Sequence, residues 1–240
     1  MSEKPRVLLK ISGETLSGKA RYGHSREAMD FMAEEIVSVE NRYELAIVVG
    51  GGNIIRGSRL IKDLNIDATA AHNAGMHATV INGAIFKCIL REHYGLPVRH
   101  LITPNFHVGA LGERYTVEEA RAHLDKGRII ILTGGTGVPF GTTDGAMVNL
   151  ALQVNASVAL KGTKVDGIYE QNPDEVPEAK KIPRMTYDEY IQRNLKILDV
   201  DAVALARNSE LTIKVFKIFE EKGNLKRILA GEDIGSIISA

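Results

Sequence analysis

Short apolar runs rich in β-branched residues alternate along the chain with longer stretches in which apolar residues recur every three or four positions. The short runs predict strands, and the longer stretches predict amphipathic helices. The run Ile129-Ile130-Ile131-Leu132 is apolar at every position, which is typical of a strand covered on both faces. The expected strands are Val7–Ile11, Leu45–Val49, Val98–Thr103, Arg128–Leu132, Ser157–Leu160, Thr212–Phe216 and, more weakly, Ser236–Ile238.

The predicted helices lie between these strands. They are Arg26–Glu40, Asp67–His93, Val117–Lys126, Asp144–Asn155, Tyr187–Asn194, Asp199–Asn208 and Asn224–Ala230. Strand–helix alternation predicts an α/β sandwich with a mostly parallel sheet and right-handed crossovers. No linker or change in composition marks a boundary, so residues 1–240 are expected to form a single domain. The turn-rich segment Gly167–Pro183 predicts an exposed excursion from that domain, and a hairpin is one form it can take.

The composition of the chain argues against several classes of protein function. The chain has 30 Lys and Arg residues against 30 Asp and Glu residues, and zero net charge argues against a general nucleic-acid binder. The single cysteine, Cys88, lies in an apolar helical stretch and is predicted to be a buried packing residue in a reducing compartment. Without a signal peptide or an apolar run of membrane length, the sequence predicts a cytoplasmic protein with no membrane partner.

A lysine and a glycine follow the first expected strand, at the edge where parallel α/β sheets bind ligands. In Lys10-Ile11-Ser12-Gly13-Glu14 the lysine can meet phosphate oxygens, and the Ser12 and Gly13 amides can approach a ligand closely. The overlapping segment Gly13–Lys19 matches the first seven positions of a P-loop. Ala20, however, stands where the Ser or Thr magnesium ligand is required, so we reject a P-loop.

Two further glycine-rich loops follow the second and fourth expected strands. Gly50–Gly57 contains three successive glycines and Arg56, which suits close approach to an anion at the start of a helix. Thr133–Asp144 contains four threonines and four glycines, and its Asp144 has two open roles: N-cap of the next helix, or organiser of lysines or magnesium. After the fifth strand, Lys161 and Lys164 flank a Gly-Thr pair suited to donor phosphates.

The order and spacing of these motifs resemble the amino acid kinase superfamily and, within it, the bacterial UMP kinases. The resemblance extends from Val7 to Ile238. It implies a three-layer α/β/α sandwich with a mostly parallel central sheet, and transfer of the terminal phosphoryl group of magnesium-bound ATP to UMP. It also implies a homohexamer, with GTP and UTP as effectors. The motifs that carry it include Leu8–Glu14, Gly50–Gly57, Gly75-Met76, Ala78–Val80, Gly135–Gly137, Pro139-Phe140, Thr142–Asp144, Thr163–Gly167, Leu195–Asp199 and Gly231-Glu232.

The same resemblance implies roles for individual residues. Those implied at ATP are Lys10, Ile11, Ser12, Gly13, Gly52, Arg56, Thr163, Tyr169 and Asn172. Those implied at UMP are Gly51, His72, Thr136, Gly137, Val138, Pro139, Phe140, Gly141, Thr142 and Thr143. The implied catalytic residues are Lys10, Arg56, Asp144 and Lys161. No side chain is implied as a metal ligand, because Mg²⁺ is expected to come with ATP.

Four positions depart from the family pattern. His72 replaces an aspartate expected to hold the ribose hydroxyls, Val138 replaces an asparagine and Gly141 an aromatic residue, while Asn172 replaces an aspartate on the ATP side. Three of the four lie on the acceptor side, so a kinase with a different small anionic acceptor is an alternative. A non-catalytic relative that binds a nucleotide or an oxyanion is another, although retention of the four implied catalytic residues argues against it.

Overall fold

The computed structural model describes residues 4–20, 22–103, 105, 109–173, 175–219 and 221–240. In these residues one sheet has nine strands, in the order β4-β3-β5-β2-β1-β6-β10-β11-β9, and every neighbouring pair is parallel except β10 with β11. The strands are β1 (Arg6–Ile11), β2 (Glu44–Val49), β3 (Val98–Ile102), β4 (Glu113–Arg114), β5 (Ile129–Thr133), β6 (Val158–Thr163), β9 (Arg184–Thr186), β10 (Thr212–Lys217) and β11 (Ser236–Ser239).

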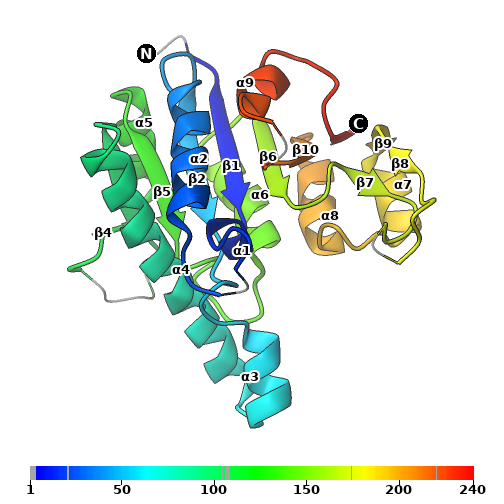
Figure 1. The fold of residues 1–240 in the computed structure, drawn as a ribbon, viewed down its shortest axis with the longest axis horizontal. Coiled ribbons are helices and arrows are strands. Elements are labelled where there is room, and N and C mark those ends of the chain that lie inside the picture. Colours follow the sequence, from blue (N-terminus) through cyan, green and yellow to red (C-terminus); the bar gives the residue numbers. More distant parts are fainter. Residues whose placement is uncertain (1–3, 21, 104, 106–108, 174, 220) are drawn as a thin grey trace.

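Helices cover both faces of this sheet (Figure 1). One face carries α2 (Arg26–Val37), α4 (Ala68–Glu92) and α9 (Asn224–Leu229). The other carries α5 (Val117–Asp125), α6 (Thr143–Gln153), α7 (Tyr187–Gln192) and α8 (Val200–Asn208). The expected α/β/α sandwich is therefore confirmed, and each expected element is present within three residues of its predicted ends.

Alternation along the strands produces two hydrophobic cores. In β1, Val7 and Leu9 pack with the α2 and α4 layer, whereas Leu8 between them packs with the α6 layer. Successive side chains of a strand point to opposite faces, so a strand buried on both faces must be apolar at nearly every position. This explains the continuous apolar runs in the sequence.

The segment predicted as an excursion leaves the main sheet after β6. It forms a small antiparallel hairpin of β7 (Ile168–Tyr169) and β8 (Lys181–Ile182), with Ile168 opposite Ile182. Two helices were not among the predicted ones: α1 (Gly13–Leu16), directly after β1, and α3 (Gly57–Leu64), after the triple-glycine loop. In α3 no residue is buried, and although Leu60, Ile61 and Leu64 recur at helical spacing, eight residues are too few for a reliable helical pattern.

Cys88 corrects the prediction that the lone cysteine is buried. It is exposed on α4. Phe86 and Leu90, one turn apart, form the buried stripe of this part of the helix. Cys88 lies two residues from each and therefore points to the other side.

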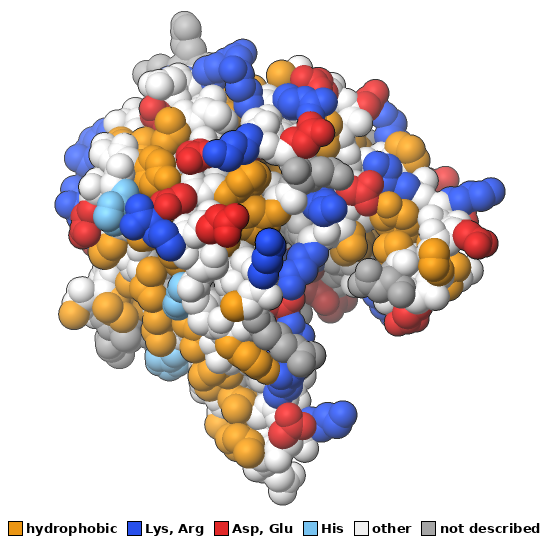
Figure 2. Space-filling model, viewed as in Figure 1, with side chains coloured by type: hydrophobic (Ala, Val, Ile, Leu, Met, Phe, Trp, Pro, Cys, Tyr) orange, Lys and Arg blue, Asp and Glu red, His pale blue; other side chains and the backbone are white. Residues whose placement is uncertain are grey.

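Helix α3 and the beginning of α4 project beyond the carboxyl edge of the sheet (Figure 1). Hydrophobic side chains gather on this projection (Figure 2), among them Ile61, Leu64 and Ile66. None of the described helices combines the length and apolarity needed to cross a membrane.

Candidate active site

Two lysines lie side by side at the carboxyl ends of neighbouring strands. In the parallel pair β1–β6, Lys10 is in register with Lys161, so both side chains lie on the face covered by α6. Their side chains are only 9% and 8% exposed. The predicted strand ended at Leu160, but β6 continues through Lys161, and it is this extension that brings the two charges together.

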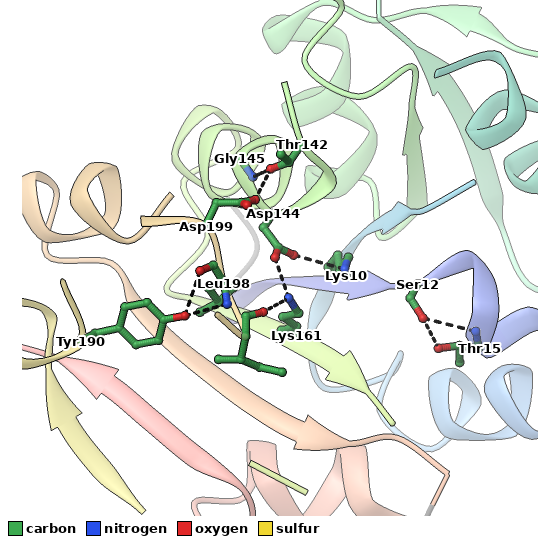
Figure 3. A network of polar contacts seen from close by, with 11 residues as sticks. Lys10, Ser12, Thr15, Thr142, Asp144, Gly145, Lys161, Tyr190, Leu198 and Asp199 are labelled. Carbon is green, nitrogen blue, oxygen red and sulfur yellow. Dashed lines mark hydrogen bonds and ion pairs between the residues drawn. The ribbon is translucent and has the colours of Figure 1, made fainter. Parts of the chain in front are cut away.

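Asp144 lies between the two lysines (Figure 3). Its Oδ1 is 3.1 Å from Lys10 Nζ, and its Oδ2 is 2.5 Å from Lys161 Nζ. Burial alone would raise the pKa of Asp144, but the charges of the two lysines outweigh it and hold the pKa below its ordinary value. Burial lowers the pKa of Lys161, and Asp144 opposes that shift only in part. The carboxylate is thus the counterion that lets two cations share a buried site.

Thr142, rather than Asp144, caps helix α6. The Thr142 hydroxyl accepts a hydrogen bond from Gly145 N–H at 3.0 Å and donates one to the Asp199 carboxylate. Asp144 lies in the first turn, where its side chain turns toward the lysines. Of its two predicted roles, the N-cap role is therefore wrong, and the role as organiser of lysines agrees with the geometry.

A loop segment also contacts Lys161. Lys161 Nζ also donates to the carbonyl oxygen of Ile197, between α7 and α8. The adjoining residue, Leu198, is bonded through both of its backbone groups to the buried hydroxyl of Tyr190 (Figure 3). The motif Leu195–Asp199 was singled out in the sequence without a role, and it proves to be part of the lysine site.

The loop after β1 turns directly into a helix. Ser12 caps α1, with its hydroxyl accepting from Thr15 N–H at 3.2 Å. At Gly13, an added Cβ would lie 2.6 Å from Gly52 N and 2.9 Å from Gly50 O, so two glycine-rich loops touch here. Because the helix begins at Gly13, residues 13–19 do not form the long anion-wrapping loop of a P-loop, in agreement with its rejection.

Buried amides hold the triple-glycine loop in place. Asn82 of α4 donates to Gly50 O at 2.7 Å and to Asn53 Oδ1 at 2.6 Å. Gly51 packs so closely on α4 that a Cβ there would lie 2.8 Å from Gly75 O. Neither asparagine was predicted from sequence to matter.

Arg56 follows the triple-glycine loop and forms an ion pair with Glu14 of α1. Lys164, beyond β6, pairs with the same carboxylate at 3.3 Å. The structure thereby brings Arg56 and Lys164 to Glu14, next to Gly13. The carboxylate that joins them was not predicted.

The loop predicted to hold the acceptor lies against α4. The rings of His72 and Phe140 are 4.8 Å apart, centroid to centroid. Phe140 has a positive φ of 67°, which is rare for a bulky residue, and its side chain is exposed. At Gly141 a Cβ would overlap Thr136 Oγ1 and lie 2.9 Å from Thr136 Cγ2, so glycine is required in this loop conformation.

Two of the three residues predicted for the adenosine side, Tyr169 and Asn172, lie together. Tyr169 and Asn172 line one cavity of about 520 Å³, which is closed on another side by Arg193–Ile197. The Tyr169 hydroxyl donates to Asp166 at 2.6 Å, and Asn172 donates to Glu175 at 2.9 Å. Thr163 ends β6 nearby in the chain. This cavity is large enough for a purine nucleoside.

Comparison with known proteins agrees with this geometry. Residues 5–217 match the model of the amino acid kinase family. The chain belongs to this family. It is 43% identical over 228 residues to the uridylate kinase of Sulfurovum sp. (strain NBC37-1), covering 95% of each chain. It is 41% identical over 233 residues to the uridylate kinase of Wolinella succinogenes, covering 97% of this chain and 95% of the relative.

Solved structures give the same result for the fold. The crystal structure of a UMP kinase from Bacillus anthracis superposes with a TM-score of 0.92 at 34% identity, covering 98% of this chain and 97% of that chain. A UMP kinase from Ureaplasma parvum superposes with a TM-score of 0.91 at 29% identity over the full length of both chains. As a member of the amino acid kinase family, the chain therefore shares the complete fold with these enzymes.

Proposed function

We propose that this protein is a UMP kinase, which transfers the γ-phosphoryl group of ATP to UMP and forms UDP and ADP. The observation that carries the proposal is the buried Lys10–Asp144–Lys161 group at the meeting point of the glycine-rich loops. Its support is that the chain covers nearly the whole length of relatives that are named uridylate kinases.

The reaction requires little covalent help from the protein. Phosphoryl transfer is catalysed mainly by positioning the two substrates and by neutralising the charge that develops between them. Lys10 and Lys161 supply two fixed positive charges, and Asp144 holds their ammonium groups in place. The phosphate of UMP is already a nucleophile at neutral pH, so no general base is needed.

The donor and the acceptor occupy different sides of the lysines in this proposal. ATP binds with its phosphates at Lys10, Ser12 and Gly13 and its adenosine near Tyr169 and Asn172, in the cavity described above. UMP binds at Gly51, His72 and the loop 136–143, where the His72–Phe140 contact supports a shared binding surface. Arg56 moves from Glu14 to the phosphates when nucleotide binds.

Mg²⁺ arrives with ATP. Both carboxylate oxygens of Asp144 are in ion pairs, and across the described residues no three His, Cys, Asp or Glu side chains gather as a set of metal ligands. These residues fit an ion carried by the nucleotide phosphates better than one held by the protein alone. When bound, the ion would neutralise charge on those phosphates.

Release of ADP with and without UMP tests the proposal. UMP-dependent ADP release by the wild-type protein, lost in the Lys10→Ala variant, is the expected result. The variant excludes a contaminating kinase, because only the protein under test carries the change. ADP release that UMP does not stimulate would contradict the assignment.

A kinase with a changed acceptor is the second candidate. It is favoured by the acceptor loop, in which Val138 is exposed and Gly141 permits a turn that no other residue could adopt without movement. A panel of nucleoside monophosphates and small carboxylates in the same assay decides between the two. A non-catalytic binding protein is disfavoured, because simple storage of a ligand does not need a buried lysine pair with a shared counterion.

We also propose that the protein forms a homohexamer in the cytoplasm. The exposed apolar side chains Ile61, Leu64 and Ile66 on the α3–α4 projection favour contact with other copies of the chain. Both substrates are cytoplasmic metabolites. Light scattering reports the number of subunits, and adding GTP or UTP to the ADP assay tests both as effectors.

A further inference from the structure

Two residues contact the ammonium of Lys161, and one of them is not among the proposed catalytic residues. Lys161 Nζ donates to Asp144, and the carbonyl oxygen of Ile197 accepts from the same Nζ. Ile197 belongs to the loop between α7 and α8, so neither a helix nor a strand fixes this carbonyl. A contact outside regular secondary structure can therefore fix its direction.

Tyr190 supplies that contact (Figure 3). Its side chain is fully buried on α7, and its hydroxyl accepts from Leu198 N–H at 2.7 Å while donating to Leu198 O at 2.8 Å. Leu198 N–H and the Ile197 carbonyl are the two polar groups of one peptide unit. Since that unit is planar and its N–H and C=O point in opposite directions, holding the N–H also aims the carbonyl.

We propose that Tyr190 is a positioning residue for phosphoryl transfer, which fixes the ammonium of Lys161 through the Ile197–Leu198 peptide. The inference rests on the proposed function. An ammonium has three protons, and Asp144 Oδ2 and Ile197 O take two of them. The direction of the third proton is then determined, which leaves one donor preorganised for the phosphoryl group. Without the carbonyl, the ammonium pivots about Asp144 alone.

Helix α7 also contains a matched control. Tyr187 lies three residues earlier and is buried to 3% exposure. Its hydroxyl has no hydrogen-bond partner within the described part of the chain. Tyr→Phe at either position removes one buried hydroxyl from the same helix, but only Tyr190→Phe releases the peptide that holds Lys161.

Steady-state kinetics of the two variants give the first test. For Tyr190→Phe we expect kcat to fall about tenfold, the effect of a misplaced catalytic group, with KM for ATP and UMP unchanged. For Tyr187→Phe we expect wild-type kcat. Thermal melts fix an assay temperature at which both variants are folded. Wild-type kcat in Tyr190→Phe, or an equal loss in Tyr187→Phe, would overturn the inference.

Titration of Lys161 gives a second test that needs no turnover. The ¹³Cε signal of Lys161, assigned with Lys161→Arg, is followed against pH by NMR. A carbonyl acceptor favours the charged ammonium, so its loss lowers the pKa of Lys161. The other groups facing this ammonium are Asp144 from α6, Lys10 from β1 and Asp199 before α8, and the Tyr190 change leaves them in place.

The expected outcome is a Lys161 titration at lower pH in Tyr190→Phe and an unchanged one in Tyr187→Phe. Identical titrations in all three proteins would overturn the inference. A wild-type protein that does not turn over UMP would contradict the proposed function alone, because the titration still reports whether Tyr190 controls Lys161.

Discussion

Replacing Asp144 by asparagine removes the single negative charge that two buried lysines share. The side chain keeps its shape, so the packing of α6 is preserved. The helix cap also survives, because Thr142 provides it. What changes is that Lys10 and Lys161, in register on adjacent strands, lose the carboxylate that pairs with both of them.

The loss of unfolding free energy in Asp144→Asn follows from the geometry of the two ion pairs. The ion pairs span 3.1 and 2.5 Å at side chains that are 11% exposed or less. Removing one partner from a buried ion pair typically costs about 3–5 kcal/mol. Deprotonation of one lysine limits this cost, since burial and Lys10 already lower the pKa of Lys161, and losing Asp144 lowers it further. We therefore expect Asp144→Asn to lose ~3 kcal/mol of unfolding free energy and, with one cation neutral, about 100-fold in kcat.

The residual kcat of the Asp144→Asn variant should depend on pH. Because losing Asp144 lowers the pKa of Lys161 further, acidification restores its proton in the variant, and residual activity should rise from pH 9 to pH 6 more steeply than in the wild type. The assay is kcat at saturating substrates across these pH values, together with urea unfolding.

Glu35→Gln is the control for stability alone. Glu35 is a buried carboxylate on α2, in the opposite layer, and accepts from the N–H groups of Gly223 and Leu225. Its loss should destabilise the fold without changing kcat. A kcat for Asp144→Asn within about threefold of wild type would refute the counterion argument.

Three further outcomes are expected. Lys10→Ala should remain folded yet lose about 100-fold in kcat, measured by coupled ADP release, because a charge near the transferred phosphoryl group is removed. Gly141→Ala should raise KM for UMP about tenfold with KM for ATP unchanged, because its Cβ displaces Thr136 and with it the acceptor loop. Burial lowers the pKa of His100 to about 4, so the unfolded state binds more protons than the native state between pH 6.5 and 4. Stability should fall by ~3 kcal/mol on acidification through that window, less so in His100→Gln, as urea unfolding would measure.

The sheet could be predicted from sequence because most of its strands are buried on both faces. Ile129–Leu132 is apolar throughout and Val7–Ile11 is apolar at every position except Lys10, and that pattern needs no tertiary information. The extension of β6 through Lys161 could not be predicted in this way, because Lys161-Gly162-Thr163 contains no apolar residue. Lys161 is buried beside Asp144, which lies 17 residues away in the chain. Likewise β4 and β9 have two and three residues, too few for a periodic signal.

The parts of the candidate site that consist of recognisable residue types, such as glycines and lysines that follow strands, could be predicted from sequence. The parts that depend on contacts between residues distant in the chain could not. Tyr190 looks like an ordinary helical core residue, and its contact with Leu198 arises from a loop closing back on the helix. Glu14 lies within the Leu8–Glu14 motif, but its ion pairs could not be predicted. Glu14, Arg56 and Lys164 follow three different strands, and only the folded sheet brings them together.

Two departures from the family pattern, Gly141 and His72, can be understood from their contacts. Glycine at position 141 replaces an aromatic residue, and histidine at position 72 replaces a carboxylate. In the structure, the Thr136 side chain occupies the space that a Cβ at position 141 would need, while Phe140, with its positive φ, meets the His72 ring. An aromatic residue at position 141 alone would therefore place its Cβ against the Thr136 side chain, which would have to move. We therefore expect that changing the residue at position 141 alone disturbs the proposed acceptor loop, so that Thr136 and Gly141 should be exchanged together.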